Sequence, residues 1–344
     1  MSIIITDKMV KVNEKWTEKR KQAQETAKKM KQAGYFKRGL RMMLCGTQLE
    51  TYICPKCGEV KVKKANLCRD RFCPVCKWRL SLQRYSQMCK IMNWLNENEK
   101  KIGTFKFGFL TLTIKNCKCS ELSETLKLMN NAWDRCCKRK TFKENVSGWA
   151  RSTEITYNQR SNTVHPHFHC IMLFERELTN NYINELRKEF TKMWKERLGV
   201  TYTPIVDFRK VVNMHPSNEF TNVEKAALET FKYAVKDSET NEMPLNSFRR
   251  VVEGLQSKRL VSFGGVLKLA KTETQAEMEE VKEDTEDITI QCTCGESMKE
   301  ALLKWSFDEN NFRLYTLEKG KIEVETDKKE IENELKRYLE YERK

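Results

Sequence analysis

Histidine is rare in this 344-residue chain, and three of its four histidines lie within five residues of one another. They fall in the segment Val164-His-Pro-His-Phe-His-Cys-Ile-Met-Leu-Phe174. Side chains alternate between the two faces of a strand, so His167 and His169 should point to one face and Phe168 to the other. Two imidazoles on one face can bind a single metal ion and leave its other positions open. The pair therefore predicts a metal site, against the alternative of ordinary polar strand residues.

Glu154 is the nearest carboxylate that could complete this site. It lies in the preceding predicted strand and would give a ligand set of two histidines and one carboxylate. An exposed strand carboxylate with no ligand role is the alternative.

Two cysteine pairs, Cys54-Pro-Lys-Cys57 and Cys73-Pro-Val-Cys76, are separated by fifteen residues. This spacing is typical of a structural zinc site, in which four thiolates surround the ion. Cys68 lies close by and could replace one of the four. A loop with buried cysteine thiols is the alternative. Cys292-Thr-Cys294 is too sparse to predict a second site.

Basic residues surround these cysteines and could bind DNA phosphates, although exposed loop cations are often merely solvated. They are Arg69, Arg71, Lys77, Arg79 and Arg84.

A third group of reactive side chains is predicted on a helix over residues 224–236. Glu229 and Tyr233 are four residues apart and share a face, with Lys236 one turn further on. A phenol has a pKa near 10, so it attacks poorly unless its phenolate is stabilised or its electrophile activated. Alone, this pattern is typical of surface residues.

The net charge of +16 indicates a polyanionic partner, with nucleic acid the first candidate. Residues 1–270 hold 51 basic and 27 acidic residues, a net of +24, and residues 271–344 hold 13 and 21, a net of −8. No apolar run approaches the length of a transmembrane helix and no secretory signal is evident, so we expect a cytoplasmic protein without membrane contact. Reducing conditions there favour free or metal-bound thiols over disulfides.

Alternating patterns predict the elements that position these residues. Strands are predicted over 105–114, 150–157, 165–174 and 202–212, with helices over 122–136, 182–198 and 224–236. Further helices are predicted over 11–33 and 78–98, and a hairpin over 312–317 and 322–325. The β-α-β-β-α-β-α order predicts an α+β fold, with a ferredoxin-like or RRM-like antiparallel sheet carrying helices on one face.

Three of these segments, in order and spacing, resemble the motifs of rolling-circle replication initiators of the His-hydrophobic-His (HUH) endonuclease class. They are Phe109-Leu-Thr-Leu-Thr-Ile114, the pair His167 and His169, and Tyr233-x-x-Lys236. The stretch Leu67-Cys-Arg-Asp-Arg-Phe-Cys-Pro-Val-Cys-Lys-Trp-Arg79 further resembles the Rep proteins of small Gram-positive plasmids. The resemblance covers roughly residues 45 to 237.

The resemblance implies a plasmid initiator that nicks and rejoins DNA. Tyr233 would attack the scissile phosphate, leaving a 5′-phosphotyrosine and a 3′-hydroxyl primer. Mg²⁺ or Mn²⁺ would be held by His167 and His169, with Glu154 or water completing the ligands, and Zn²⁺ would be structural. Glu229 would activate water for the terminating cleavage. The partners would be origin DNA, a host helicase and DNA polymerase.

The expected domains follow the same division. They are a basic helical segment over 1–44, the zinc module and connecting helix over 45–100, the endonuclease domain over 101–265, an acidic linker over 266–290 and an α/β appendage over 291–344. A transposase or relaxase of the same class, and a non-catalytic zinc-dependent DNA-binding protein, remain alternatives. The sequence does not indicate an oligomeric state.

Overall fold

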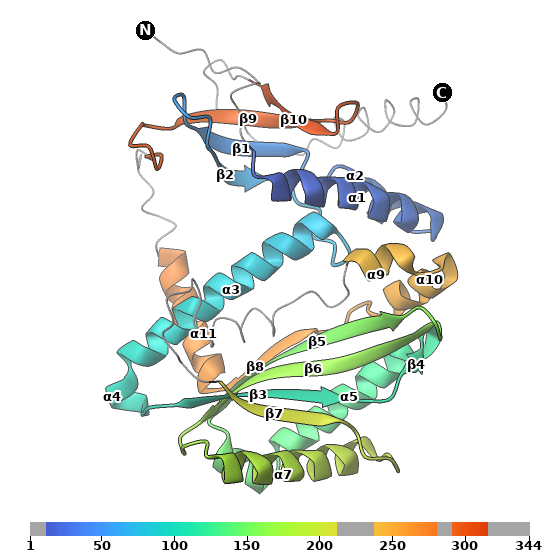
Figure 1. Cartoon of the computed structure of the whole chain (residues 1–344), viewed down its shortest axis with the longest axis vertical. Coiled ribbons are helices and arrows are strands. Elements are labelled where there is room, and N and C mark those ends of the chain that lie inside the picture. Colours follow the sequence, from blue (N-terminus) through green and yellow to red (C-terminus); the bar gives the residue numbers. More distant parts are fainter. Residues whose placement is uncertain (1–11, 212–236, 281–290, 316–344) are drawn as a thin grey trace. The chain divides into compact units, whose positions relative to one another are not determined.

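The computed structural model describes residues 12–211, 237–280 and 291–315, which form a mixed α and β protein. Its elements belong to two compact units (Figure 1). The first, which we call the cysteine unit, comprises residues 1–79 and 285–344. The second, the central unit, comprises residues 80–284. The cysteine unit is therefore built from both ends of the sequence.

The central unit is built on an antiparallel sheet in the order β7-β3-β6-β5-β8, with the short β4 paired to β6. Its strands are β3 Lys106–Thr113, β4 Cys117–Lys118, β5 Gly148–Asn158, β6 Thr163–Phe174, β7 Val206–Val211 and β8 Val261–Gly265. Helices α5 Leu122–Cys137 and α7 Asn180–Leu198 connect β3 to β5 and β6 to β7. The predicted α+β class, the antiparallel sheet and the order up to β7 are confirmed, and the last predicted helix, over residues 224–236, lies outside the described residues.

Alternation along β6 divides its residues between the main core and the opposite face of the sheet. Phe168, Cys170, Met172 and Phe174 are buried in a core that α5 and α7 line with Trp133, Phe190 and Trp194 among others. The odd-numbered residues of β6, which include the three histidines, point to the opposite face. The histidines of β6 are therefore not buried in the main core, which receives only apolar side chains from this part of the strand.

Helices also cover one end of that opposite face, where the prediction had placed none. Residues of α3 Pro74–Glu97 and α11 Val266–Glu280 pack there against the sheet. The buried residues at this end are Met88, Ile91, Leu95, Phe109, Ala150, Ile171, Leu173, Leu267 and Ala270. Because these sheet positions are apolar and need cover, the region expected as an acidic linker begins as a packed helix.

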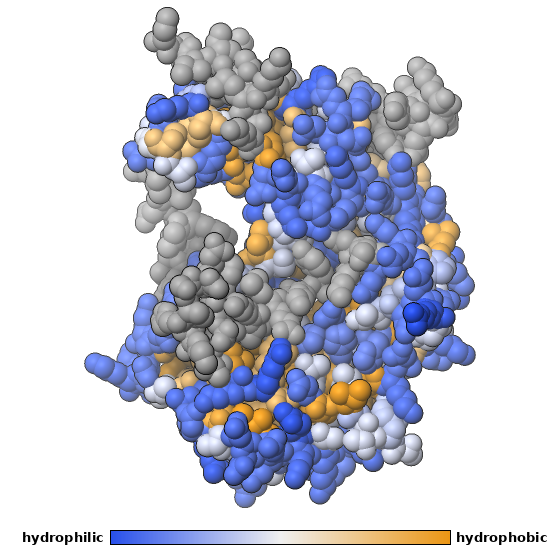
Figure 2. All heavy atoms as spheres, viewed as in Figure 1, coloured by the Kyte–Doolittle hydropathy of each residue, from blue (hydrophilic) through white to orange (hydrophobic). Residues whose placement is uncertain are grey.

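The remaining helices in the described part of the central unit are short. They are α4 Glu99–Ile102, the 3₁₀ turn η2 Cys119–Glu121, α6 Lys140–Asn145, α9 Asp237–Glu242 and α10 Leu245–Gly254. None of the helices in the described ranges is long and apolar enough to cross a membrane. The face of the molecule drawn in Figure 2 is mostly hydrophilic, with hydrophobic residues exposed between.

The cysteine unit has its own antiparallel sheet, in the order β10-β9-β1-β2. Its strands are β1 Gln48–Ile53, β2 Val60–Ala65, β9 Lys299–Ser306 and β10 Asn311–Tyr315. Every residue of β1 has a partner on β9. The C-terminal strands thus complete a sheet begun near the N-terminus and do not form the separate appendage that was expected.

The predicted C-terminal hairpin paired residues 312–317 with residues 322–325, and the structure gives the first of these segments another partner. Residues 311–315 pair with β9, which sequence patterns did not reveal, and residues 316–344 lie outside the described part of the chain.

Helices α1 Glu14–Gln32 and α2 Phe36–Met43 complete the cysteine unit. Although α1 is largely polar, it buries Trp16, Ala23, Ala27 and Met30 at helical spacing. A side chain at Gly39 of α2 would place its Cβ 2.8 Å from the Ala27 carbonyl oxygen, so glycine permits the close contact of the two helices. Ala27 and Gly39 thus let the two helices approach closely at this point.

Arg20 ties α1 to the C-terminal strands. Its guanidinium lies 5.6 Å from the Trp305 ring centroid and 5.5 Å from that of Phe307, and it donates a hydrogen bond to the Met43 carbonyl. A charged residue thus serves as a core contact in this unit.

We expect Phe168→Ala to lower the free energy of unfolding by about 3–5 kcal/mol, because a fully buried ring is lost and a cavity remains. The ring lies 5.9 Å from that of Trp194, and the Arg151 guanidinium lies 4.0 Å from its centroid. Urea unfolding followed by circular dichroism measures the change. Leu128→Ala, at a more exposed position of α5, should cost within about 0.5 kcal/mol, and equal losses in the two variants would contradict this account.

Candidate metal centres

Glu154, His167 and His169 meet on the face of the central sheet opposite the aromatic core. The Glu154 Oε2 atom lies 2.9 Å from His169 Nε2 and 3.3 Å from His167 Nε2. Each side chain is only 10–13% exposed. The structure therefore brings together the two histidines and the carboxylate that the sequence suggested.

Strand register makes this meeting possible. On β5, Glu154 pairs directly with His167, and Ser152 pairs with His169. On the other side of β6, Thr111 of β3 also pairs with His169. Residues at paired positions share a face, so three adjacent strands contribute side chains to one point.

Pro166 lies between the histidines without disrupting the ladder. On the side that faces β3 and β4, pairing stops at His167 and resumes at Val164. A proline lacks an N–H donor, and it is tolerated where no such partner is required.

Hydrogen bonds at the far side of each ring direct its Nε2 atom to the site. His167 Nδ1 lies 3.2 Å from the His165 carbonyl oxygen, and His169 Nδ1 lies 3.2 Å from Thr111 Oγ1. A carbonyl oxygen only accepts, so Nδ1 of His167 carries a proton. In a neutral ring its Nε2 then presents a lone pair toward Glu154, an arrangement that is favourable only with a cation between them or with the ring protonated.

The donor set fits a divalent cation. Neighbouring ligands of an octahedral ion at about 2.1 Å lie about 3.0 Å from each other, close to the two distances observed here. Two imidazoles and one carboxylate leave further positions for water or substrate oxygens.

Electrostatics at the site favour an ionised carboxylate. Burial alone would raise the pKa of Glu154, but hydrogen bonds donated by protonated His167 and His169 rings outweigh it and hold that pKa far below its usual range. Burial, followed by the charge of His167, lowers the pKa of His165. An anion is thus present at the site across the physiological range of pH.

Sequence analysis did not identify two neighbours of the histidines, Thr111 and Phe109, or the cation that packs on Phe109. Thr111 contacts His169, the Phe109 ring centroid lies 5.6 Å from that of His169, and the exposed Arg209 places its guanidinium 4.7 Å from the Phe109 centroid. Thr111 and Phe109 belong to a predicted strand, but only pairing register reveals that they face the histidines.

Glu229, Tyr233 and Lys236 lie outside the described residues. Their predicted roles therefore stay predictions.

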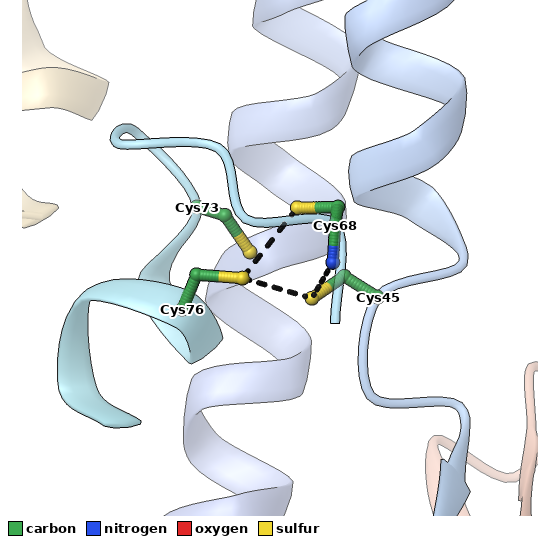
Figure 3. Close-up of side chains that lie close together, drawn as sticks. All are labelled: Cys45, Cys68, Cys73 and Cys76. Atoms are coloured by element: carbon green, nitrogen blue, oxygen red, sulfur yellow. Dashed lines mark hydrogen bonds between the residues drawn. The ribbon is translucent and has the colours of Figure 1, made fainter. Parts of the chain in front are cut away.

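Four cysteines of the cysteine unit form a second candidate centre, Cys45, Cys68, Cys73 and Cys76, drawn in Figure 3. All four are buried. The Cys76 Sγ atom lies 3.4 Å from Cys45 Sγ and 3.7 Å from Cys68 Sγ, and four sulfur ligands of tetrahedral zinc at about 2.3 Å lie about 3.8 Å apart. Backbone N–H groups of Cys68 and Arg69 donate to Cys45 Sγ and Cys76 Sγ. Burial and the neighbouring thiols raise the pKa of Cys73, so four thiolates here require a cation.

This grouping corrects the predicted set of Cys54, Cys57, Cys73 and Cys76. The structure places Cys73 and Cys76 with Cys45 and Cys68, and it places Cys54 and Cys57 with Cys292 and Cys294. The two pairs of the sequence motif thus belong to different clusters, because each pair lies within 4.8 Å of two other cysteine sulfurs. Spacing alone could not reveal Cys45, which has no cysteine within three residues, or the distant pair at 292 and 294.

The five basic residues expected to bind DNA differ in accessibility. Arg69 and Arg71 are exposed, whereas Lys77 is only 6% exposed. Arg79 is half-buried over the rings of Trp16 and Trp78, and burial lowers the pKa of the half-buried Arg84. By exposed surface, Arg69 and Arg71 are the most accessible of the five, although burial lowers the pKa of Arg71 as well.

Comparison with known proteins gives consistent matches. The sequence profile of a family described as "Replication protein" matches residues 59–315. "Protein rep" of Streptococcus pneumoniae serotype 2 is 32% identical over 232 residues, which cover 66% of this chain and 69% of that protein. "Protein rep" of Bacillus amyloliquefaciens is 33% identical over 250 residues, covering 68% and 72%. "Protein rep" of Lentilactobacillus hilgardii is 29% identical over 290 residues, covering 81% and 88%. No solved structure matches the chain significantly.

We expect Glu154→Gln to weaken Mn²⁺ binding by at least about 10-fold, because the substitution removes the only carboxylate of this donor set and its charge. Isothermal titration calorimetry on the full chain measures the affinity. Glu175→Gln, at an exposed position beyond the end of β6, is the matched control and should bind as the native chain does. Equal affinities for Glu154→Gln and the control would show that the carboxylate is not a ligand.

Proposed function

Because this chain belongs to the family of replication proteins, we propose that it is a plasmid replication initiator that nicks one strand of its origin DNA. The observation that carries the proposal is the meeting of Glu154, His167 and His169 on one sheet face. The likeness of the chain to HUH endonucleases supports the same assignment, since their paired histidines hold the metal ion.

His167, His169 and Glu154 would hold Mg²⁺ or Mn²⁺, which withdraws charge from the scissile phosphate and fixes its position. Thr111 and the His165 carbonyl orient the two rings from behind. Positive charge for DNA phosphates would come from three exposed arginines, Arg69, Arg71 and Arg209.

Tyr233 is the proposed nucleophile. Its phenolic oxygen attacks the scissile phosphorus, and the bond from phosphorus to the 3′-oxygen breaks. The phenolic proton is lost and the departing oxygen gains one, so the products are a 5′-phosphotyrosine and a 3′-hydroxyl. Lys236 would stabilise the phenolate, and Glu229 would activate water for the terminating cleavage.

The 3′-hydroxyl gives a primer for the host DNA polymerase, and a host helicase would separate the strands ahead of it. We propose that the reaction takes place in the cytoplasm, where a plasmid origin is accessible. The buried sulfurs of Cys45, Cys68, Cys73 and Cys76 would hold a structural Zn²⁺, since four protein ligands leave no position for substrate.

We expect Tyr233→Phe to abolish the covalent DNA adduct, because the nucleophilic oxygen is removed. The assay uses a labelled origin oligonucleotide with Mn²⁺ and detects an SDS-stable complex by gel electrophoresis. Tyr315→Phe, at an exposed position of the cysteine unit, is the control and should form the adduct normally. Adduct formation by Tyr233→Phe at the native level would refute the assignment, and its absence from the native protein would favour a non-catalytic DNA-binding protein.

We expect Glu229→Ala to form the adduct at a near-native level and to release it slowly, because only the terminating cleavage needs the activated water. A time course of adduct decay with a second origin sequence measures this release. Glu242→Ala, at an exposed position of α9, should behave as the native protein does. Loss of the first nick in Glu229→Ala would instead mean that this carboxylate assists Tyr233.

A further inference from the structure

Four cysteines that sequence spacing did not connect converge at one end of the cysteine unit. Cys54 Sγ lies 3.5 Å from Cys294 Sγ, and Cys57 Sγ lies 3.4 Å from Cys292 Sγ. The four ligand atoms all lie within 4.8 Å of one another. More than 230 residues of sequence separate the two pairs, so only the fold brings them together.

Each pair is presented by a tight turn that depends on glycine. After the first pair, Gly58 has a φ of +75° and donates to the Cys54 carbonyl at 3.0 Å. After the second pair, Gly295 has a φ of +83° and donates to the Cys292 carbonyl at 2.9 Å. Glycine adopts this left-handed conformation without strain, so both loops can turn sharply around the sulfurs.

A backbone hydrogen bond closes each of the two turns. Cys54 N–H donates to the Glu59 carbonyl, and Cys292 N–H donates to the Glu296 carbonyl. The first turn joins β1 to β2, and the second lies before β9, which pairs with β1. Two rigid turns on neighbouring strands therefore face each other, which is the arrangement that supplies a metal ion with four sulfurs.

The sulfur separations distinguish this cluster from a pair of disulfides. A disulfide bond is about 2.05 Å long, whereas four thiolates around zinc lie about 3.8 Å apart. The separations of 3.4 and 3.5 Å are much nearer to the second value. They are also nearly equal to those of the buried cluster of Cys45, Cys68, Cys73 and Cys76.

We propose that Cys54, Cys57, Cys292 and Cys294 bind a second structural zinc ion. Binding releases the four thiol protons and leaves four sulfur–zinc bonds with no open position. Cys292 Sγ donates to Glu59 Oε2 at 2.9 Å, and Thr293 Oγ1 donates to the same oxygen at 2.9 Å. When zinc binding displaces the Cys292 thiol proton to solvent, Glu59 keeps the Thr293 hydroxyl as its hydrogen-bond partner.

The ion would fasten the C-terminal strands to the N-terminal ones. Its ligands flank the central unit in sequence, so one bound ion joins the segments before and after that unit. Pairing of β9 with β1 would then be reinforced at the end where the two turns meet. This zinc site does not depend on the nicking reaction and would persist if that activity were absent.

Metal content of the purified full chain tests the proposal. Inductively coupled plasma mass spectrometry should find two zinc ions per native chain, and one in the double variant Cys292→Ser/Cys294→Ser. The matched control, Cys117→Ser/Cys119→Ser, changes another Cys-x-Cys sequence that lies in neither sulfur cluster and should retain two. A double variant that still holds two zinc ions would overturn the proposal.

Site-resolved alkylation covers the case in which the double variant does not fold. In the native chain, iodoacetamide should leave Cys54, Cys57, Cys292 and Cys294 unmodified until a strong chelator is added, as peptide mapping would report. Cys294 is exposed, so burial alone would not protect it. Modification of Cys294 before chelation, or disulfides linking these four residues in place of zinc, would refute the site.

Discussion

The pairing register of β6 with its two neighbours is the constraint on which the proposed catalytic site depends. Glu154 stands opposite His167, and Thr111 stands opposite His169, only in this register. A slip of one residue would turn the histidines into the main core and Phe168 out of it. The large aromatic core on one face of the sheet therefore determines where the polar ligands on the other face can lie.

Core residues and candidate metal ligands are therefore adjacent in the sequence of β6 but point to opposite faces of the sheet. Phe168 packs against Trp194 and the Arg151 guanidinium, while its neighbours in sequence carry the two imidazoles. Helices α3 and α11 cover the apolar end of the histidine face and leave the polar end to the ligands. The same sheet thus provides stability through one set of positions and a donor set for a divalent ion through the other.

In the cysteine unit, the candidate metal ligands are two clusters of cysteine sulfur atoms. A small sheet and two helices bury a limited core, and part of that core is the charged Arg20. Two clusters of four sulfurs lie at different places in this unit, one confined to its N-terminal part and one shared with its C-terminal strands. Metal coordination at the two clusters would supply folding energy that a small core lacks, which gives a physical reason for two candidate centres in one small unit.

The sequence by itself determined the local features of this protein. Alternation placed His167 and His169 on one face, periodicity placed α5 and α7, and their order gave an antiparallel α+β fold. The helix over residues 78–98 was likewise recognised, although α3 begins earlier, at Pro74. These features depend on neighbours within a few residues, which is the range over which a pattern carries information.

Only the tertiary structure decided which distant residues meet. Spacing paired Cys54 and Cys57 with Cys73 and Cys76. The fold instead places Cys73 and Cys76 with Cys45 and Cys68, and it places Cys54 and Cys57 with Cys292 and Cys294. It also paired β9 with β1 and brought Thr111 to His169. Such contacts depend on strand register and on the return of the chain to its first sheet, and both are set by the packing of the whole core.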